Sequence, residues 1–140
     1  MDTLQNEKSF GKLIVRTTAA SGAIPIAGAT VIVRKTDENG VSQMLGTYLT
    51  DINGLTEPLT IETPNLSESL SPGGKQPFSE ITTEVSADGY FSTTNINIPI
   101  YPGITSIQPV SMVPIPESQN GANQPSSDII FDNGMQRPNL

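Results

Sequence analysis

The fold is decided by the stretch ATVIVRK at residues 29–35. Successive side chains of an extended chain point to opposite faces, and branched side chains favour strands. Ala29, Val31 and Val33 therefore share one face, which we expect to lie in the core. The opposite face carries Thr30, Ile32 and Arg34. This pattern predicts a strand in a half-buried sheet.

The residues that follow predict a hairpin. The sequence DENG at 37–40 is typical of a turn, because Asn and Gly accept positive φ, and a second run of strand-forming residues extends from Met44 to Thr50. Short runs and turns alternate in the same way along the chain, which predicts seven strands and no helix. The other five strands are expected at residues 12–18, 55–63, 79–86, 90–98 and 104–113, with an edge segment at 24–28.

The length and composition fit one domain with long polar ends. A chain of 140 residues can bury one core, and its 12 Gly and 12 Pro suit many turns. We expect an all-β, seven-stranded antiparallel sandwich of the prealbumin-like or immunoglobulin-like type at residues 11–116. A flexible N-terminal arm at 1–10 and a polar C-terminal tail at 117–140 are expected to flank it.

Two missing residue types restrict the possible chemistry. The chain has no Cys, so disulfides and zinc-thiolate sites are excluded. It also has no His, the usual general base near neutral pH and the commonest metal ligand. From these absences we predict that the chain is not an enzyme, and that it has no catalytic residue, no metal site and no cofactor.

Charge and hydropathy limit the possible partners. The net charge is −7, and the seven Lys and Arg residues form no long run, which argues against nucleic acid. No segment approaches the ~20 apolar residues that a membrane span needs, and the first residues contain no apolar export signal. We therefore expect neither nucleic acid nor a membrane as partner, and the sequence does not determine the localisation.

Acidic residues suggest a calcium site and a glycosidase site, but each has a simpler structural interpretation. Asp51, Asn53 and Gly54 resemble the start of an EF-hand loop whose twelfth position is Glu62, but a strand at 55–61 would separate them, so we predict a plain turn. Glycoside hydrolysis needs a pair of carboxylates beside a sugar cleft. A chain with no Trp and three Tyr has few sugar platforms, which favours a solvated strand face. The acids concerned are Glu57, Glu62, Glu80 and Glu84.

An apolar island interrupts the polar tail. The sequence DIIFD at 128–132 places three bulky apolar side chains together, and they are costly to leave in water. The island could add an edge strand to its own sandwich or to a neighbouring subunit. The predicted partner-binding residues are Ile129, Ile130 and Phe131 of the island, with Leu4 and Phe10 of the arm.

Several motifs, taken in order, resemble a known family. GKLIVR at 11–16, IPIAGATV at 24–31, TDINGLT at 50–56 and DGY at 88–90 resemble the carboxypeptidase regulatory-like, transthyretin-like sandwich domain. A closer likeness, which includes NIPIYPGITSIQPVSMVPIP at 97–116, is to the non-catalytic domain of clostridial spore cortex-lytic and peptidoglycan-binding proteins. The resemblance implies a sandwich and a Gram-positive spore or cell-envelope setting.

Two functions follow as expectations. The first is a structural module that assembles into a homo-oligomer or filament by strand addition through its terminal extensions. The second is a carbohydrate-binding accessory domain for peptidoglycan.

Overall fold

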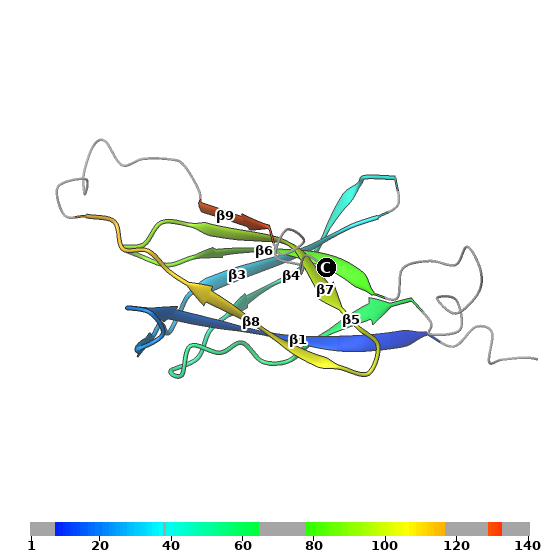
Figure 1. Cartoon of the computed structure of the whole chain (residues 1–140), viewed down its shortest axis with the longest axis horizontal. Helices are drawn as coiled ribbons and strands as arrows, with labels where there is room; N and C mark the ends of the chain where they lie inside the picture. Colours follow the sequence, from blue (N-terminus) through cyan, green and yellow to red (C-terminus); the bar gives the residue numbers. More distant parts are fainter. Residues whose placement is uncertain (1–7, 38, 65–77, 117–128, 133–140) are drawn as a thin grey trace, which may run out of the picture.

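The computed structural model describes residues 8–37, 39–64, 78–116 and 129–132. In these ranges the chain forms strands and turns but no helix, and therefore contains no membrane-spanning helix. Two sheets face each other across one core (Figure 1). The prediction of an all-β sandwich is confirmed.

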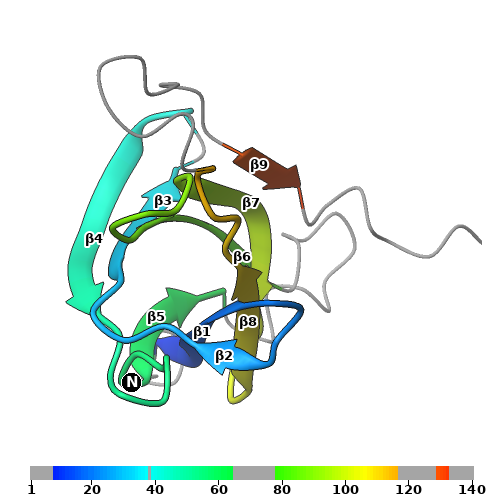
Figure 2. The same ribbon diagram turned by 90° about the vertical axis from the view of Figure 1, so that its left-hand side faces the viewer.

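The larger sheet has five strands in the order β4-β3-β6-β7-β9. Neighbours from β4 to β7 are antiparallel, whereas β9 runs parallel to β7. The end-on view in Figure 2 shows β4 at one edge of this sheet and β9 at the other. The strand bounds are β3 Thr30–Thr36, β4 Ser42–Leu49, β6 Ser79–Ser86, β7 Thr93–Ile100 and β9 Ile129–Asp132.

The smaller sheet is organised around the long strand β1 (Ser9–Ala19). The strands β5 (Leu59–Thr63) and β2 (Ile24–Pro25) pair antiparallel with one side of it. On the other side β8 (Thr105–Ser111) runs parallel to β1. The chain passes from the larger sheet to the smaller one between β7 and β8, which brings β8 back beside β1 in the same direction. Two pairings are therefore parallel, where the sequence predicted an antiparallel arrangement throughout.

The core lies between the inner faces of the two sheets. Ala29, Val31 and Val33 are buried, as their alternation predicted, and they pack in one cluster with Leu13 and Val15 of β1. Full burial of a side chain of this size contributes about 1.5–3 kcal/mol. The inner face of β3 is thereby packed against β1.

Most strand boundaries differ from the prediction by one or two residues, and three differences have a clear physical reason or consequence. β1 begins at Ser9, so the last two residues assigned to the N-terminal arm belong to the sheet. Residues 55–58 form no strand apart from a bridge between Leu55 and Arg16, and β5 starts only after Pro58, which cannot donate a ladder hydrogen bond. β7 begins at Thr93, because Tyr90 forms an isolated bridge with Pro114 instead.

Candidate functional site at the sheet edges

The apolar island of the tail forms β9, the outer strand of the larger sheet. Ile130 lies opposite Thr94 of β7 and Phe131 lies opposite Asn95. The Ile129 N–H donates to the Ser92 carbonyl at 2.9 Å, at the start of the pairing. Of the two destinations that the sequence left open, the structure thus contains the edge strand on the same sandwich.

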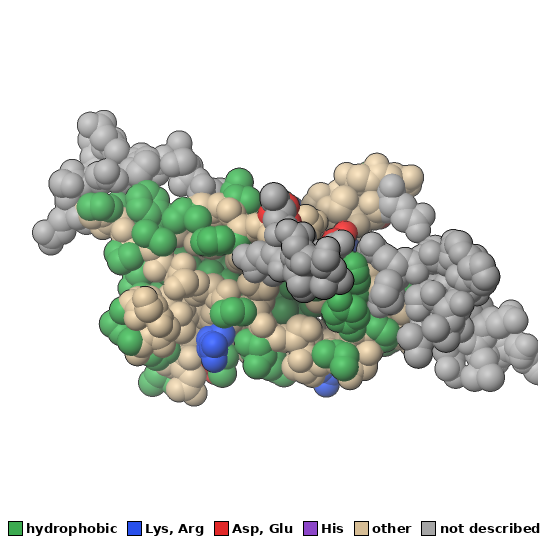
Figure 3. Space-filling view, viewed as in Figure 1, with side chains coloured by type: hydrophobic (Ala, Val, Ile, Leu, Met, Phe, Trp, Pro, Cys, Tyr) green, Lys and Arg blue, Asp and Glu red, His purple; other side chains and the backbone are tan. Residues whose placement is uncertain are grey.

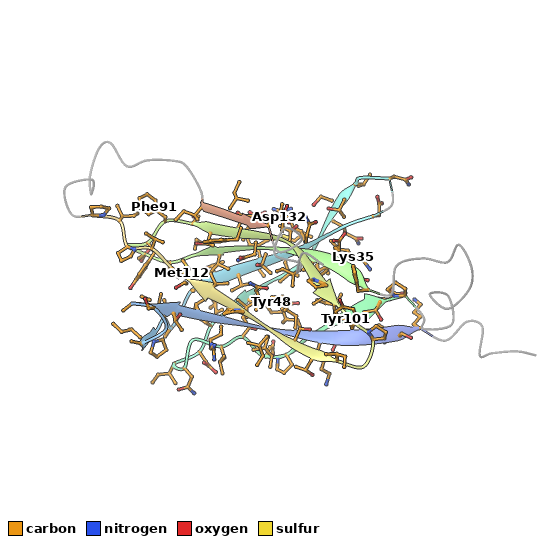
Figure 4. All side chains as sticks on the ribbon, viewed as in Figure 1. Lys35, Tyr48, Phe91, Tyr101, Met112 and Asp132 are labelled. Carbon is orange, nitrogen blue, oxygen red and sulfur yellow. The ribbon has the colours of Figure 1, made fainter. Side chains whose placement is uncertain are left out.

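A bulge in β7 provides the polar contact that holds the end of β9. The register between β6 and β7 shifts next to Asn97, which adopts a left-handed φ of 59°. Asn accepts this conformation better than most residues. Its Nδ2 donates to Asp132 Oδ1 at 2.8 Å (Figure 4 labels Asp132). The bulge also changes the alternation of β7, so that Ile98 and Ile100 point into the core.

Docking within the chain leaves much of β9 in solvent. Ile130 is 64% exposed and Phe131 is 40% exposed, while Ile129 is half-buried. The strand therefore satisfies main-chain groups of β7 without burying its own apolar side chains. These two side chains are the exposed part of the first candidate site.

The structure does not join the remaining predicted partner-binding residues to this site. Leu4 lies outside the described residues. Phe10 lies in β1, in the other sheet, where it is opposite Glu62 and 46% exposed. The prediction that these residues bind a partner stays a prediction.

A group of buried polar side chains lies on the inner surface of β6 and β7. Thr83 and Asn95 are opposite each other in the β6–β7 ladder, and Thr93 lies two residues before Asn95. The Thr83 and Thr93 hydroxyls and Asn95 Nδ2 are buried without a hydrogen-bond partner among the described residues. A buried polar group without a partner costs about 1–3 kcal/mol. This cluster was not predicted from the sequence, although Thr and Asn at alternate positions of a buried strand were its signal.

The opposite edge, β4, forms a second candidate site, which was not predicted from the sequence either. Met44 and Leu49 are 55% and 66% exposed on this strand, and Val41 just before it is exposed as well. The run VSQMLGTYL at 41–49 contains no charged residue and no proline, which was the signal available in the sequence. Charged residues and prolines are the usual protection of an edge strand, so β4 is an edge without them.

A groove runs between β4 and β5, where the two sheets are open to the side. It has a volume of about 300 Å³, with Leu45, Tyr48 and Leu59 among its apolar lining. Lys35 closes one part of it, because its Nζ donates to the Glu62 carbonyl at 3.1 Å (Figure 4 labels Lys35 and Tyr48). A bulge in the β3–β4 pairing leaves Leu45 without a partner in β3 and places it in the groove lining.

The acidic residues form simple local contacts. Asp51 Oδ1 accepts the N–H groups of Asn53 at 2.9 Å and Leu55 at 3.0 Å, which makes residues 51–55 the plain turn that was predicted. Glu84 pairs with Arg34 at 2.7 Å on the outer face of the larger sheet. Within the described ranges no three acidic side chains lie close enough together to hold a metal ion.

Comparison with known proteins gives similarity of fold only. No family model and no curated protein matches the chain. Among solved structures it is similar to the hydroxyquinol 1,2-dioxygenase of Pseudomonas putida, with 13% identity and a TM-score of 0.52 over 78% of this chain and 58% of that one. The catechol 1,2-dioxygenase of an Acinetobacter species, inhibited by bound mercury, gives 13% identity and a TM-score of 0.53 over 93% and 60%. The minor pilin of Streptococcus agalactiae gives 12% identity and a TM-score of 0.49 over 82% and 49%.

These comparisons correct the prediction about enzyme activity and support the family resemblance only as far as the fold. The chain spans about three-fifths of the length of the two dioxygenases. The prediction that the chain is not an enzyme is contradicted, because the structures that it resembles are enzymes. The sandwich implied by the family resemblance is present, whereas the particular spore or regulatory-domain family has no matching model.

Proposed function

We propose that this protein is a structural module that assembles with copies of itself by exchange of β9. The observation that supports the proposal is the exposure of Ile130 and Phe131 when β9 is docked on its own sandwich. A strand that pairs with β7 of the same chain can pair in the same register with β7 of a second chain. In an assembly, neighbouring copies can cover the apolar side chains that a single copy leaves in water.

Exchange is tested by cross-linking across the β7–β9 pair. The chain has no Cys, and Thr94 lies opposite Ile130. Neighbouring strands are about 4.8 Å apart, within the Cα separation that a disulfide spans. We expect a mixture of the single variants Thr94→Cys and Ile130→Cys to form a disulfide between two different chains under mild oxidation.

The control for random collision is Ile52→Cys mixed with Thr94→Cys, because Ile52 is 81% exposed in the turn before Gly54. The double variant Thr94→Cys/Ile130→Cys reports docking within one chain. Exchange does not occur if the double variant forms only an intramolecular disulfide at every concentration and the mixture forms intermolecular disulfides no faster than the Ile52→Cys control.

Assembly is tested with a charge on the exposed side of β9. We expect Ile130→Asp to shift the chain towards the monomer in size-exclusion chromatography with light scattering, because it adds charge to the contact. Ile52→Asp makes the same change at an exposed turn position outside β7 and β9 and should leave the mass distribution unchanged. Equal behaviour of the two variants would contradict the proposal.

A second candidate function, peptidoglycan binding, has one observation in its favour. The rings of Phe78 and Tyr101 meet edge to face with centroids 5.3 Å apart, and Tyr101 is 41% exposed. Exposed aromatic rings are the usual platforms for sugars. Co-sedimentation with purified peptidoglycan that is lost in Tyr101→Ala and retained in Ile130→Asp would favour this function. The spore or cell-envelope setting implied by the motifs at 11–116 belongs to either proposal.

A further inference from the structure

The described edge strands differ in how they are protected against pairing. In the smaller sheet β5 carries Glu62 and β8 carries Pro109. In the larger sheet β9 ends in Asp132. Charged residues and prolines at such positions discourage pairing with another chain. β4 is the longest of these four edges, with eight residues, and it carries neither.

β4 is also accessible. No described strand pairs with its outer side, and the tip of the β3–β4 hairpin stands clear of the sandwich in Figure 1. The bulge at Leu45 is the one protective feature of this edge. It does not hide the side chain, because Leu45 remains 38% exposed beside the groove. An added strand would cover Leu45 and Met44 together with the open main-chain groups.

The charge of the chain indicates which strand fits there. The net charge of −7 makes copies repel one another, so a contact between two copies is least opposed where no acidic side chain lies. Ser42–Leu49 is such a place, since its side chains are all uncharged. A strand paired with its own copy has identical side chains on both sides of the contact, and a charged strand would then oppose like charges. The face of the sandwich on the side of β8 shows more hydrophobic than charged side chains (Figure 3), but β4 lies on the far side of that view.

We infer that two copies of this protein pair through β4, antiparallel, about a two-fold axis. A two-fold axis makes the contact self-complementary and joins the two five-stranded sheets into one. The inference extends the proposed assembly function but rests on other residues, since β4 and β9 are at opposite edges. One strand pair covers less surface than a standard stable interface, so the dimer is weak when formed alone. With both edges in use, copies would alternate β4 contacts and β9 exchange and form a chain.

Sedimentation equilibrium of the full chain carrying Ile130→Asp tests the β4 contact, because this background removes the contribution of β9. We expect the mass to rise with concentration from 14.9 kDa towards twice that value. Met44→Lys should raise the dissociation constant about tenfold or more, because it adds a charge at both symmetry-related positions. Ile107→Lys is the matched control: Ile107 of β8 is 56% exposed, against 55% for Met44, and should change nothing.

Amide hydrogen exchange locates the contact in the same background. We expect the N–H groups of β4 that face away from β3 to exchange more slowly as the concentration rises, and those of β8 to be unaffected. A chain that stays monomeric at about 1 mM, where even weak dimers form, overturns the inference. Equal dissociation constants for Met44→Lys and Ile107→Lys overturn it too, as does a dimer without added protection in β4. Loss of β9 exchange alone contradicts the proposed function and leaves this inference standing.

Discussion

The two edges of the five-stranded sheet end in similar apolar side chains but are constructed differently. At one edge β7 is covered by the four-residue strand β9, which ends in Asp132 bound to Asn97. At the other edge β4 has eight residues, no charge and no covering strand among the described residues. Yet Ile130 on β9 is 64% exposed and Leu49 on β4 is 66% exposed. Addition of β9 satisfies the main chain of β7 and moves the apolar edge outward by one strand.

This comparison separates two requirements of an edge. The open N–H and C=O groups need hydrogen bonds, and a strand from the same chain can provide them. The apolar side chains need a surface to pack against, and β9 leaves its own Ile130 and Phe131 without one. Both edges of this sheet therefore present side chains suited to another copy.

The largest expected effect on stability comes from removal of the hydrogen bond that holds the end of β9. Asn97→Val places a β-branched residue at a φ of 59° and deletes the hydrogen bond to Asp132. The strained backbone and the lost bond together should lower the free energy of unfolding by about 3 kcal/mol. Urea unfolding measures this loss, and hydrogen exchange should show β9 losing protection before β4 does.

Asn97→Gly separates the two causes. Glycine accepts the left-handed φ without strain, so only the hydrogen bond is lost and the expected cost is about 1 kcal/mol. If the Val and Gly variants are equally stable, the conformation of Asn97 contributes nothing and the bulge does not hold the edge in the way described.

The sequence predicted the core of the sandwich better than its edges. Alternation placed Ala29, Val31 and Val33 on the buried face, because period-two geometry depends only on neighbouring residues. This inference needs no knowledge of which strands become neighbours. The cost of exposing three apolar residues predicted that residues 129–131 would be buried; they do pair with β7, but Ile130 and Phe131 remain exposed.

Features set by long-range pairing were not predictable in the same way. The parallel direction of β8 depends on the crossing between sheets, and the partner of β9 depends on which edge the other strands leave open. The bulge at Asn97 reverses the alternation in β7, so reading through it assigns Ile98 and Ile100 to the wrong face. The β4 edge was visible as a run without charge, but only the sheet order shows that this run is an edge.

A smaller effect on stability, of opposite sign, is expected at Thr83 of β6, the middle strand of the five-stranded sheet. The Thr83 hydroxyl is buried without a partner among the described residues, whereas Val33, opposite it in β3, is apolar. Thr83→Val keeps the shape and removes the unpaired hydroxyl, so it should raise the free energy of unfolding by about 1 kcal/mol.

Thr17→Val is the matched control for Thr83→Val. Thr17 is equally buried, but its hydroxyl donates to the Ile26 carbonyl at 2.8 Å. The same substitution should therefore lower the stability by about 1 kcal/mol. Thermal unfolding of the two variants should move in opposite directions. Two shifts of the same sign would mean that Thr83 has a hydrogen-bond partner after all.

The smallest expected effect on stability is that of the ion pair on the outer face of the five-stranded sheet. Arg34 and Glu84 are 36% and 41% exposed, so solvent screening limits their coupling to about 0.5 kcal/mol or less. A double-mutant cycle with Arg34→Met and Glu84→Gln measures this coupling, and salt should weaken it further.

The same cycle bears on the β4 edge, because Arg34 lies opposite Met44 in the β3–β4 ladder. Glu84→Gln leaves the Arg34 charge unpaired beside an edge whose pairing depends on neutrality. Dimerisation through β4 should therefore weaken slightly in Glu84→Gln at low salt and recover in the double variant, in which both charges are gone. If dimerisation strengthens in Glu84→Gln, a positive charge favours the contact, and neutrality is not what makes β4 differ from the β9 edge.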